Sequence, residues 1–324
     1  MTDEARPALH VRVGRMLGDN PVIPLLILLA VLVAVLEVMR PGIVNERWIA
    51  NTIKFAIPLA MLAACQTMTM LTGGIDMSAG VVATISAFVM ATQVPILGVP
   101  GAIAVSLVPA LLIGLANGFG VAFAHVHPLI MTLGTGLIGT GCLQVYQRTV
   151  IATGSVVPES LAWLGTGRFW LLPNALLLFV PFAVVLLVGQ RRSGFGRLLY
   201  ALGSNTHAAK LSGVRAWQVY LALYALSGLI AGVTGLLYVG LIKAPSLSLA
   251  NPLLLPSVAA AVVGGTSIFG GRGSYSGTIV GALILTVLGT LLTLLQMPEG
   301  ARRILFGAII LAVTAIYVRL SDQS

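Results

Sequence analysis

The feature that most constrains this chain is a series of uncharged apolar runs, each roughly 18 residues or longer, enough to cross the hydrocarbon core of a bilayer. Lipid offers the backbone no water, so such runs must fold as helices or as strands of a closed barrel. The runs are continuous rather than alternating, which is typical of helices. With a mean hydropathy of +1.02 and only 8% charged residues, we expect an all-α polytopic membrane protein.

Proline, glycine and charged residues divide the apolar sequence into about ten transmembrane helices within a single domain covering 1–324. The eighth helix is short. The second-to-third and eighth-to-ninth connections are rich in glycine, and we interpret them as breaks or re-entrant segments. The expected spans lie near 21–39, 52–71, 77–93, 98–123, 129–147, 171–189, 216–241, 254–268, 275–296 and 302–320.

Several expected helices carry two glycines spaced four residues apart, which leaves one helical face without side chains. In lipid, such faces allow two backbones to approach closely and gain dispersion contact. We therefore expect tight helix packing at three pairs: Gly114 with Gly118, Gly228 with Gly232, and Gly277 with Gly281.

A polar and basic segment, QRRSGFGRLLYALGSNTHAAKLSGV at 190–214, interrupts the apolar sequence. A polar loop of this length belongs in water, and we interpret it as a docking surface on the cytoplasmic side, together with a cytoplasmic tail at 1–20. The other basic residues are scattered at the ends of spans, where headgroup contact and orientation account for them. This distribution argues against nucleic-acid binding despite a formal charge of +9.

The two glycine-rich breaks, LTGGIDMSAG at 71–80 and VGGTSIFGGRG at 263–273, each place a glycine pair before polar residues. Paired interruptions of this kind can mark a transport site. The candidate translocation or gating residues are Gly73, Gly74, Asp76, Ser78, Asn117, Gly264 and Gly265, with Thr72 and Thr132 as further path-lining candidates.

Asp76 is the only acidic residue well inside the expected membrane region. A carboxylate at that depth costs roughly 2.5–3.5 kcal/mol on insertion scales, so it needs a compensating environment or a function. One alternative is that Asp76 caps the helix that begins just after it, with Ser78 nearby. The other is a contribution to gating or to the path.

His125 and His127 fall in a connection without a third ligand, so we expect them to face solvent and no metal to bind.

The sequence lacks GxxxxGK[ST], GxSxG and HExxH, so we assign no catalytic residue and no cofactor to this chain. Ion-coupled transporters commonly carry several intramembrane ionisable groups, whereas Asp76 stands alone. We therefore expect a partner to supply the energy. An ion-coupled secondary transporter or a channel is the main alternative, and an intramembrane enzyme is a more distant one.

Four stretches resemble the permease subunits of ribose-type bacterial ABC importers, within the wider group that includes branched-chain amino acid permeases. They are LTGGIDMSAG at 71–80, GLANGFGVAFAHVHPLIMTLGT at 114–135, YALGSNTHAAKLSGV at 200–214 and VVGGTSIFGGRGSYSGTIVGALI at 262–284. The last three, in this order and spacing, are the specific part. The resemblance implies a multi-pass permease of the bacterial inner membrane that translocates a sugar or a sugar-like solute.

The resemblance also implies two cytoplasmic ATPase subunits or domains that bind ATP, a second permease protomer, the same chain or a sister chain, and a periplasmic solute-binding protein. The family's coupling element, EAAxxxG, corresponds here to 207–213, with His207 in place of the glutamate. The coupling residues implied in this way are Gly203, Asn205, His207, Ala208, Ala209 and Gly213. The solute stays open among ribose, another pentose or hexose, a polyol and a purine nucleoside.

Overall fold

The computed structural model describes residues 22–150 and 154–321, so the expected tail at 1–20 lies outside the described residues. Polar residues begin several of the helices: the side chains of Asn45, Ser193 and Asn205 each accept a backbone N–H of the helix that follows. The first helices are α2 (Val22–Met39), α3 (Glu46–Met70), α4 (Ala79–Ala122), α5 (Pro128–Val150) and α6 (Glu159–Thr166). The rest are α7 (Leu176–Arg192), α8 (Gly194–Ser204), α9 (Thr206–Leu211), α10 (Ala216–Ile242), α11 (Asn251–Val263), α12 (Tyr275–Leu294) and α13 (Glu299–Ser321).

A two-stranded antiparallel hairpin separates α6 from α7. It consists of β1 (Arg168–Phe169) and β2 (Leu172–Pro173), with Arg168 opposite Pro173. The expected span at 171–189 therefore began too early, because its first residues form this hairpin and α7 starts only at Leu176.

The long helix α4 folds back on itself at Gly98, whose φ of 67° and ψ of 177° are not helical. Ser86 Oγ donates to the carbonyl of Ser106 at 3.0 Å. In a straight helix these residues would stand about 30 Å apart, since each residue adds about 1.5 Å. The two halves therefore lie side by side, in agreement with separate expected helices at 77–93 and 98–123.

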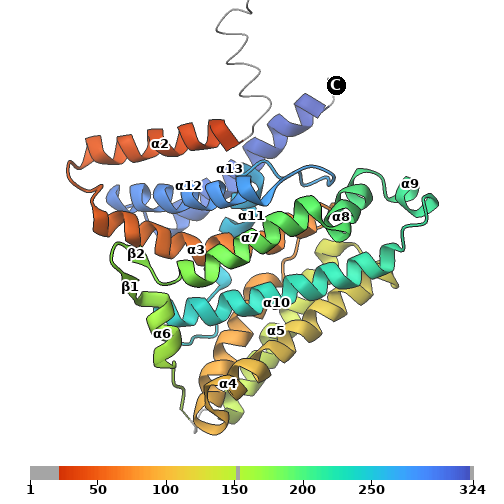
Figure 1. Ribbon diagram of the computed structural model, residues 1–324, viewed down its shortest axis with the longest axis horizontal. Coiled ribbons are helices and arrows are strands. Elements are labelled where there is room, and N and C mark those ends of the chain that lie inside the picture. Colours follow the sequence, from red (N-terminus) through yellow and green to blue (C-terminus); the bar gives the residue numbers. More distant parts are fainter. Residues whose placement is uncertain (1–21, 151–153, 322–324) are drawn as a thin grey trace, which may run out of the picture.

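The core is centred on α3 and α10. From Ala56 to Leu71 every residue is buried, so α3 is surrounded by protein rather than lying at the rim. α3 packs against α10, α11 and α12, and α10 packs along α4. Figure 1 shows α2, α12 and α3 on one side of α7, with α10, α5 and α4 on the other.

The paired glycines occupy close helix contacts, as the sequence predicted. A Cβ on Gly228 of α10 would lie 2.3 Å from the carbonyl oxygen of Ala110 and 3.2 Å from the Cα of Gly114 on α4. A Cβ on Gly281 of α12 would lie 2.2 Å from the carbonyl oxygen of Ala260 on α11. The α10–α4 and α12–α11 contacts are thus backbone against backbone.

Within the described ranges, six helices are long and apolar enough to cross a membrane, or seven if the bent pair α7 and α8 forms one span. The all-α polytopic class fits this result, whereas the expected count of about ten is not confirmed. Two expected spans fall within the single folded helix α4. A third, at 254–268, was set too long, because α11 ends at Val263 and Gly265 turns the chain with φ of 88°.

We expect Gly228→Ala to lower the thermal unfolding midpoint of the purified protein, because the added methyl group overlaps the backbone of α4. Overpacking of this kind costs about 1–3 kcal/mol. Gly289→Ala on α12 is the control, since its Cβ would meet no atom within 4 Å. Equal midpoints for the two variants would contradict the close α10–α4 contact.

Candidate functional site

The two glycine-rich breaks, far apart in sequence, meet each other and the end of α8. The N–H of Gly271 donates to the carbonyl of Leu71 at 2.9 Å. Gly203 of α8 sits directly on this contact, because a Cβ there would overlap the Leu71 carbonyl oxygen and lie 2.5 Å from the Gly271 nitrogen. Gly73 approaches the second break as well, with Phe269 O 3.5 Å from a Cβ at that position. We call this meeting point the break junction.

A tyrosine on α8 makes a further hydrogen bond to the break junction. Tyr200 donates its hydroxyl to the carbonyl of Gly273 at 2.6 Å. Burial raises the pKa of Tyr200, and the charge of Arg191 partly offsets that rise, so this phenol stays protonated and donates at neutral pH. α8 is thus attached to both breaks by backbone packing and to the second by a side chain.

Asp76 lies in the first break with both carboxylate oxygens occupied and only 2% of its surface exposed. Oδ1 accepts the N–H of Ser78 at 3.0 Å and its hydroxyl at 2.6 Å. Oδ2 accepts the hydroxyl of Ser227, on α10, at 2.6 Å. Ser78 is the N-cap residue of α4 and no side chain caps that helix, so the expected capping by Asp76 is replaced by these bonds to Ser78 just before the helix begins. The bond to Ser227 adds a link between the break and α10.

The side chain of Gln66, on α3, forms two hydrogen bonds with the backbone of Asp76. Its Nε2 donates to the Asp76 carbonyl at 2.8 Å, and its Oε1 accepts the Asp76 N–H at 3.2 Å. The side-chain amide thus replaces the helical partners that both backbone groups lose at the break. In an environment without water, leaving such groups unpaired costs several kcal/mol each.

The polar contacts continue into α4 and α5. Asn117, in the second half of α4, donates to the Ser78 hydroxyl at 2.9 Å and accepts the hydroxyl of Thr135 at 2.6 Å. Thr132 of α5 accepts the N–H of Met77 and donates to the carbonyl of Ile75, both at 3.0 Å. The first break is therefore held by α3, α4, α5 and α10.

Of the candidate translocation or gating residues, the structure gathers Asp76, Ser78 and Asn117 into this one polar cluster. Each is at most 2% exposed, and Thr132 is fully buried, so in this conformation they form a closed polar core rather than the wall of an open path. Gly74 packs beside the cluster, with the Tyr224 hydroxyl 2.8 Å from a Cβ at that position.

Gly264 and Gly265 belong to the second break, away from the polar cluster. A Cβ on Gly264 would lie 2.5 Å from the nitrogen of Thr278, so this glycine allows α11 to pack against the start of α12. Gly265 has positive φ and supplies the turn that ends α11. The backbone conformation and packing require glycine at both positions, and neither residue has a polar side chain that could contact a solute.

The hydroxyls of Ser78 and Ser227 donate to the Asp76 carboxylate, an arrangement that stabilises a negative charge there. His125 and His127 are exposed in the α4–α5 connection, as expected. In the described ranges no three His, Cys, Asp or Glu side chains lie close enough to hold a metal ion.

The short helix α9 carries the residues compared with the coupling element, and it projects at the right-hand edge of Figure 1. Asn205 begins it, accepting the N–H of Ala208 at 2.9 Å. Gly213 ends it with φ of 86°, while the N–H groups of Gly213 and Val214 donate to Lys210 and Ala209. This is a Schellman motif, which requires the left-handed conformation that glycine adopts freely.

The structure changes the interpretation of two coupling residues. The resemblance implied that Ala209 and Gly213 are coupling residues, but Ala209 is 7% exposed and packs into the protein core. Gly213 is needed for the helix end. The outward surface of α9, which we call the α9 surface, consists of His207, Ala208, Lys210 and Leu211.

Sequence reasoning missed Gln66, Ser227 and Leu211. Gln66 carries a recognisable signal, because an amide inside an apolar span needs a polar partner. Ser227 carries none, since serine is common in glycine-rich packing faces. Leu211 is 78% exposed in an otherwise polar segment, and only the helix geometry shows that it points outward.

The chain was compared with known proteins. A model of the family described as branched-chain amino acid transport system / permease component matches residues 48–314. The chain is 33% identical to the probable ABC transporter permease protein YphD of Escherichia coli, over 93% of this chain and 91% of that protein. It is 30% identical to the ribose import permease protein RbsC of Bacillus subtilis, over 87% and 88% of the two chains. It is 31% identical to the galactofuranose transporter permease protein YtfT of Escherichia coli, over 81% and 76%. No solved structure matches the chain.

We expect Ser227→Ala to lower the thermal unfolding midpoint of the detergent-solubilised protein, because it removes the donor to Asp76 Oδ2. A hydrogen bond to a charged group contributes about 1.5–3 kcal/mol. The matched control is Ser257→Ala, another fully buried serine, whose hydroxyl donates to Leu254 of its own helix. In an Asp76→Asn background the Ser227→Ala change should cost less, and additive shifts would contradict a direct link.

Proposed function

The chain belongs to the family of branched-chain amino acid transport system permease components. On that premise we propose that it is the membrane-spanning subunit of an ATP-driven importer for a sugar or a sugar-like solute. The observation that carries this proposal is similarity over most of the chain to permeases named for ribose, galactofuranose and fructose. These relatives are transport subunits, and the chain is a multi-pass membrane protein like them.

The proposal includes partners. Two cytoplasmic ATPase subunits or domains bind and hydrolyse ATP, and a second permease protomer completes the path. A periplasmic solute-binding protein delivers the sugar to the permease, which translocates it across the inner membrane. The α9 surface is the contact for the ATPase. Segment 190–215 carries Arg191, Arg192, Arg197, Lys210 and Arg215 and no acidic residue, so it favours an acidic partner surface.

The contacts of α8 suggest how force passes from the ATPase into the membrane helices. α9 follows α8 directly, and α8 ends against the break junction through Gly203 and Tyr200. Gly203 has no side chain that could move aside and absorb a displacement. A movement of α8 is therefore transmitted directly to the backbone of both breaks. The permease thereby changes shape while performing no covalent chemistry.

The polar cluster around Asp76 is the element on which this displacement acts. In the closed arrangement, Asp76 joins the first break to α10 through Ser227, and Ser78 joins it to Asn117. We assign it the role of a latch that holds the path closed until α8 moves. Asn117, Ser78 and Thr132 then become candidates for contact with the hydroxyl groups of a passing sugar.

Transport in liposomes tests the assigned function. With the ATPase and the binding protein of the same system present, uptake of a labelled sugar such as ribose or fructose should require internal ATP and the binding protein. Ionophores that collapse ion gradients should leave the initial rate unchanged. Uptake by this chain alone, driven by an ion gradient, would establish an ion-coupled transporter instead.

A tryptophan on the α9 surface tests the coupling contact. We expect Ala208→Trp to weaken co-purification with the ATPase about tenfold or more, because a bulky residue in a packed interface costs about 1–3 kcal/mol. Ala244→Trp is the control: Ala244 is also exposed but lies just beyond the opposite end of α10. Equal retention of the ATPase by both variants would refute the assignment of α9.

A further inference from the structure

A cavity of about 170 Å³ lies inside the elbow where α7 meets α8. The two helices are bent by 63° at this point. Ser193 fixes the elbow, since its hydroxyl donates to the carbonyl of Gly189 and accepts the N–H of Gly196 at 2.9 Å. A Cβ on Gly196 would lie 2.3 Å from the Gln190 carbonyl oxygen, so the start of α8 packs directly against the end of α7.

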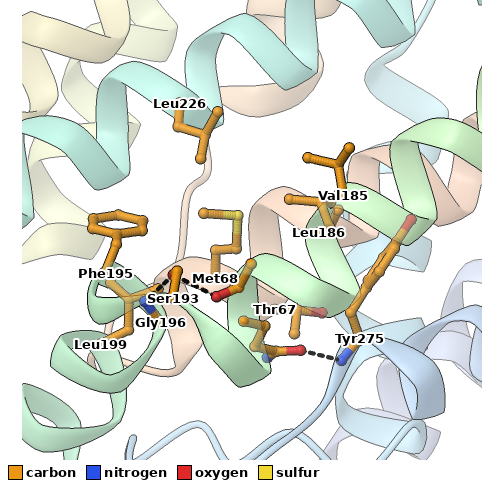
Figure 2. A pocket seen from close by; sticks show the side chains of 13 residues that line it. Thr67, Met68, Val185, Leu186, Ser193, Phe195, Gly196, Leu199, Leu226 and Tyr275 are labelled. Carbon is orange, nitrogen blue, oxygen red and sulfur yellow. Dashed lines mark hydrogen bonds between the residues drawn. The ribbon is translucent and has the colours of Figure 1, made fainter.

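The wall of the cavity is almost entirely apolar. Figure 2 shows Met68 of α3, Leu186 of α7, Phe195 of α8 and Leu226 of α10 around the open space. α7 packs against α3, α8 and α12, and the cavity fills the space between α7 and α10. Val185, which also lines it, is 69% exposed on the outer surface of the bundle. The cavity therefore opens on the outer surface of the bundle beside Val185.

One polar group in the wall lacks a partner. The Oε1 atom of Gln190 accepts the N–H of Tyr275 at 2.9 Å, but its Nε2 has no acceptor, although the side chain is only 9% exposed. The hydroxyls of Thr67, Ser193 and Tyr275 all bond to the protein. A ligand that fits this cavity is thus an apolar chain with one hydrogen-bond acceptor at the Gln190 end.

Positive charge lies next to that same end. Arg191 and Arg192 follow Gln190 directly, in the last turn of α7, and both are exposed. Segment 190–215 contains no carboxylate to neutralise them. Basic residues at the end of a membrane helix attract anionic headgroups.

The order apolar chain, carbonyl acceptor and phosphate is the chemical order of a phospholipid from its tail to its head. We propose that the elbow cavity binds one acyl chain of an anionic phospholipid. Its ester carbonyl accepts from Gln190 Nε2, and its phosphate pairs with Arg191 and Arg192. Such a chain fills the space between α7 and α10 and supports the bend from which α8 and α9 extend.

Photolabelling in nanodiscs tests the proposal. The protein is placed in phosphatidylcholine containing a trace of phosphatidylglycerol with a photoreactive group on one acyl chain, and labelled peptides are mapped by mass spectrometry. We expect the label on peptides that contain Met68, Val185 and Leu226. Unlabelled phosphatidylglycerol should compete better than phosphatidylcholine, and replacing both arginines with glutamine should reduce this preference by about fivefold per charge.

Gly189→Leu fills the cavity from α7, because a Cβ there would meet no atom within 4 Å. It should abolish labelling of these peptides, whereas Gly141→Leu, at an exposed glycine of α5 with equally open space, should leave it unchanged. Leu226→Trp fills the cavity from α10 and serves if Gly189→Leu misfolds.

Three results would overturn the proposal. The first is undiminished labelling in a folded Gly189→Leu or Leu226→Trp variant. The second is a label confined to other helices. The third is efficient crosslinking of Val185→Cys to a second copy of the chain, which would show that protein rather than lipid covers the opening.

Discussion

Two broken segments inside an apolar bundle leave backbone groups that lipid cannot satisfy, and the rest of the structure depends on how the protein pairs them. The two breaks pair with each other, through the N–H of Gly271 and the carbonyl of Leu71. Gln66 supplies both a donor and an acceptor to the backbone of Asp76. The breaks are therefore ordered parts of the core, and a carboxylate can lie beside them because hydroxyl and amide donors surround it.

This arrangement places α9, for which we propose a coupling role, in one continuous contact path with the breaks and the polar cluster. α9 lies at the surface, α8 connects it to the break junction, and the first break connects the junction to Asp76. Each contact is either a backbone-to-backbone contact or a short hydrogen bond. Close-packed contacts of these kinds have low compressibility, so they transmit a displacement rather than absorb it. A displacement at α9 therefore has a continuous route to α10 and α5, through backbone packing at the break junction and through side-chain hydrogen bonds at the polar cluster.

The elbow between α7 and α8 adjoins this path, and its packing is incomplete. Gly196 packs directly against the end of α7, while an apolar cavity lies between α7, α8 and α10. Filling that cavity with a lipid chain would make the bend as rigid as the junction to which α8 leads. The lipid environment would then contribute to the stiffness of α8, which leads to the proposed ATPase contact on α9.

The sequence by itself determined the class of fold, the approximate place of most helices, the close packing of paired glycines and the unusual position of Asp76. These follow from local properties: apolar length, the absence of a side chain, and the cost of burying one charge. It also determined the family, because the motifs occur in a specific order. It also predicted two separate helices at 77–93 and 98–123, but not that Gly98 is the residue whose conformation breaks α4, since glycine is frequent throughout this chain.

Only the tertiary structure decided that Gly203 belongs to the break junction, that Ala209 faces inward, and that Ser227 is the partner of Asp76. Ser227 is 151 residues away from Asp76. A hydrogen bond of that separation exists only once α10 has packed beside the first break. The local sequence determines which polar groups of a segment require a hydrogen-bond partner. Which distant segment provides that partner depends on how the helices pack around one another.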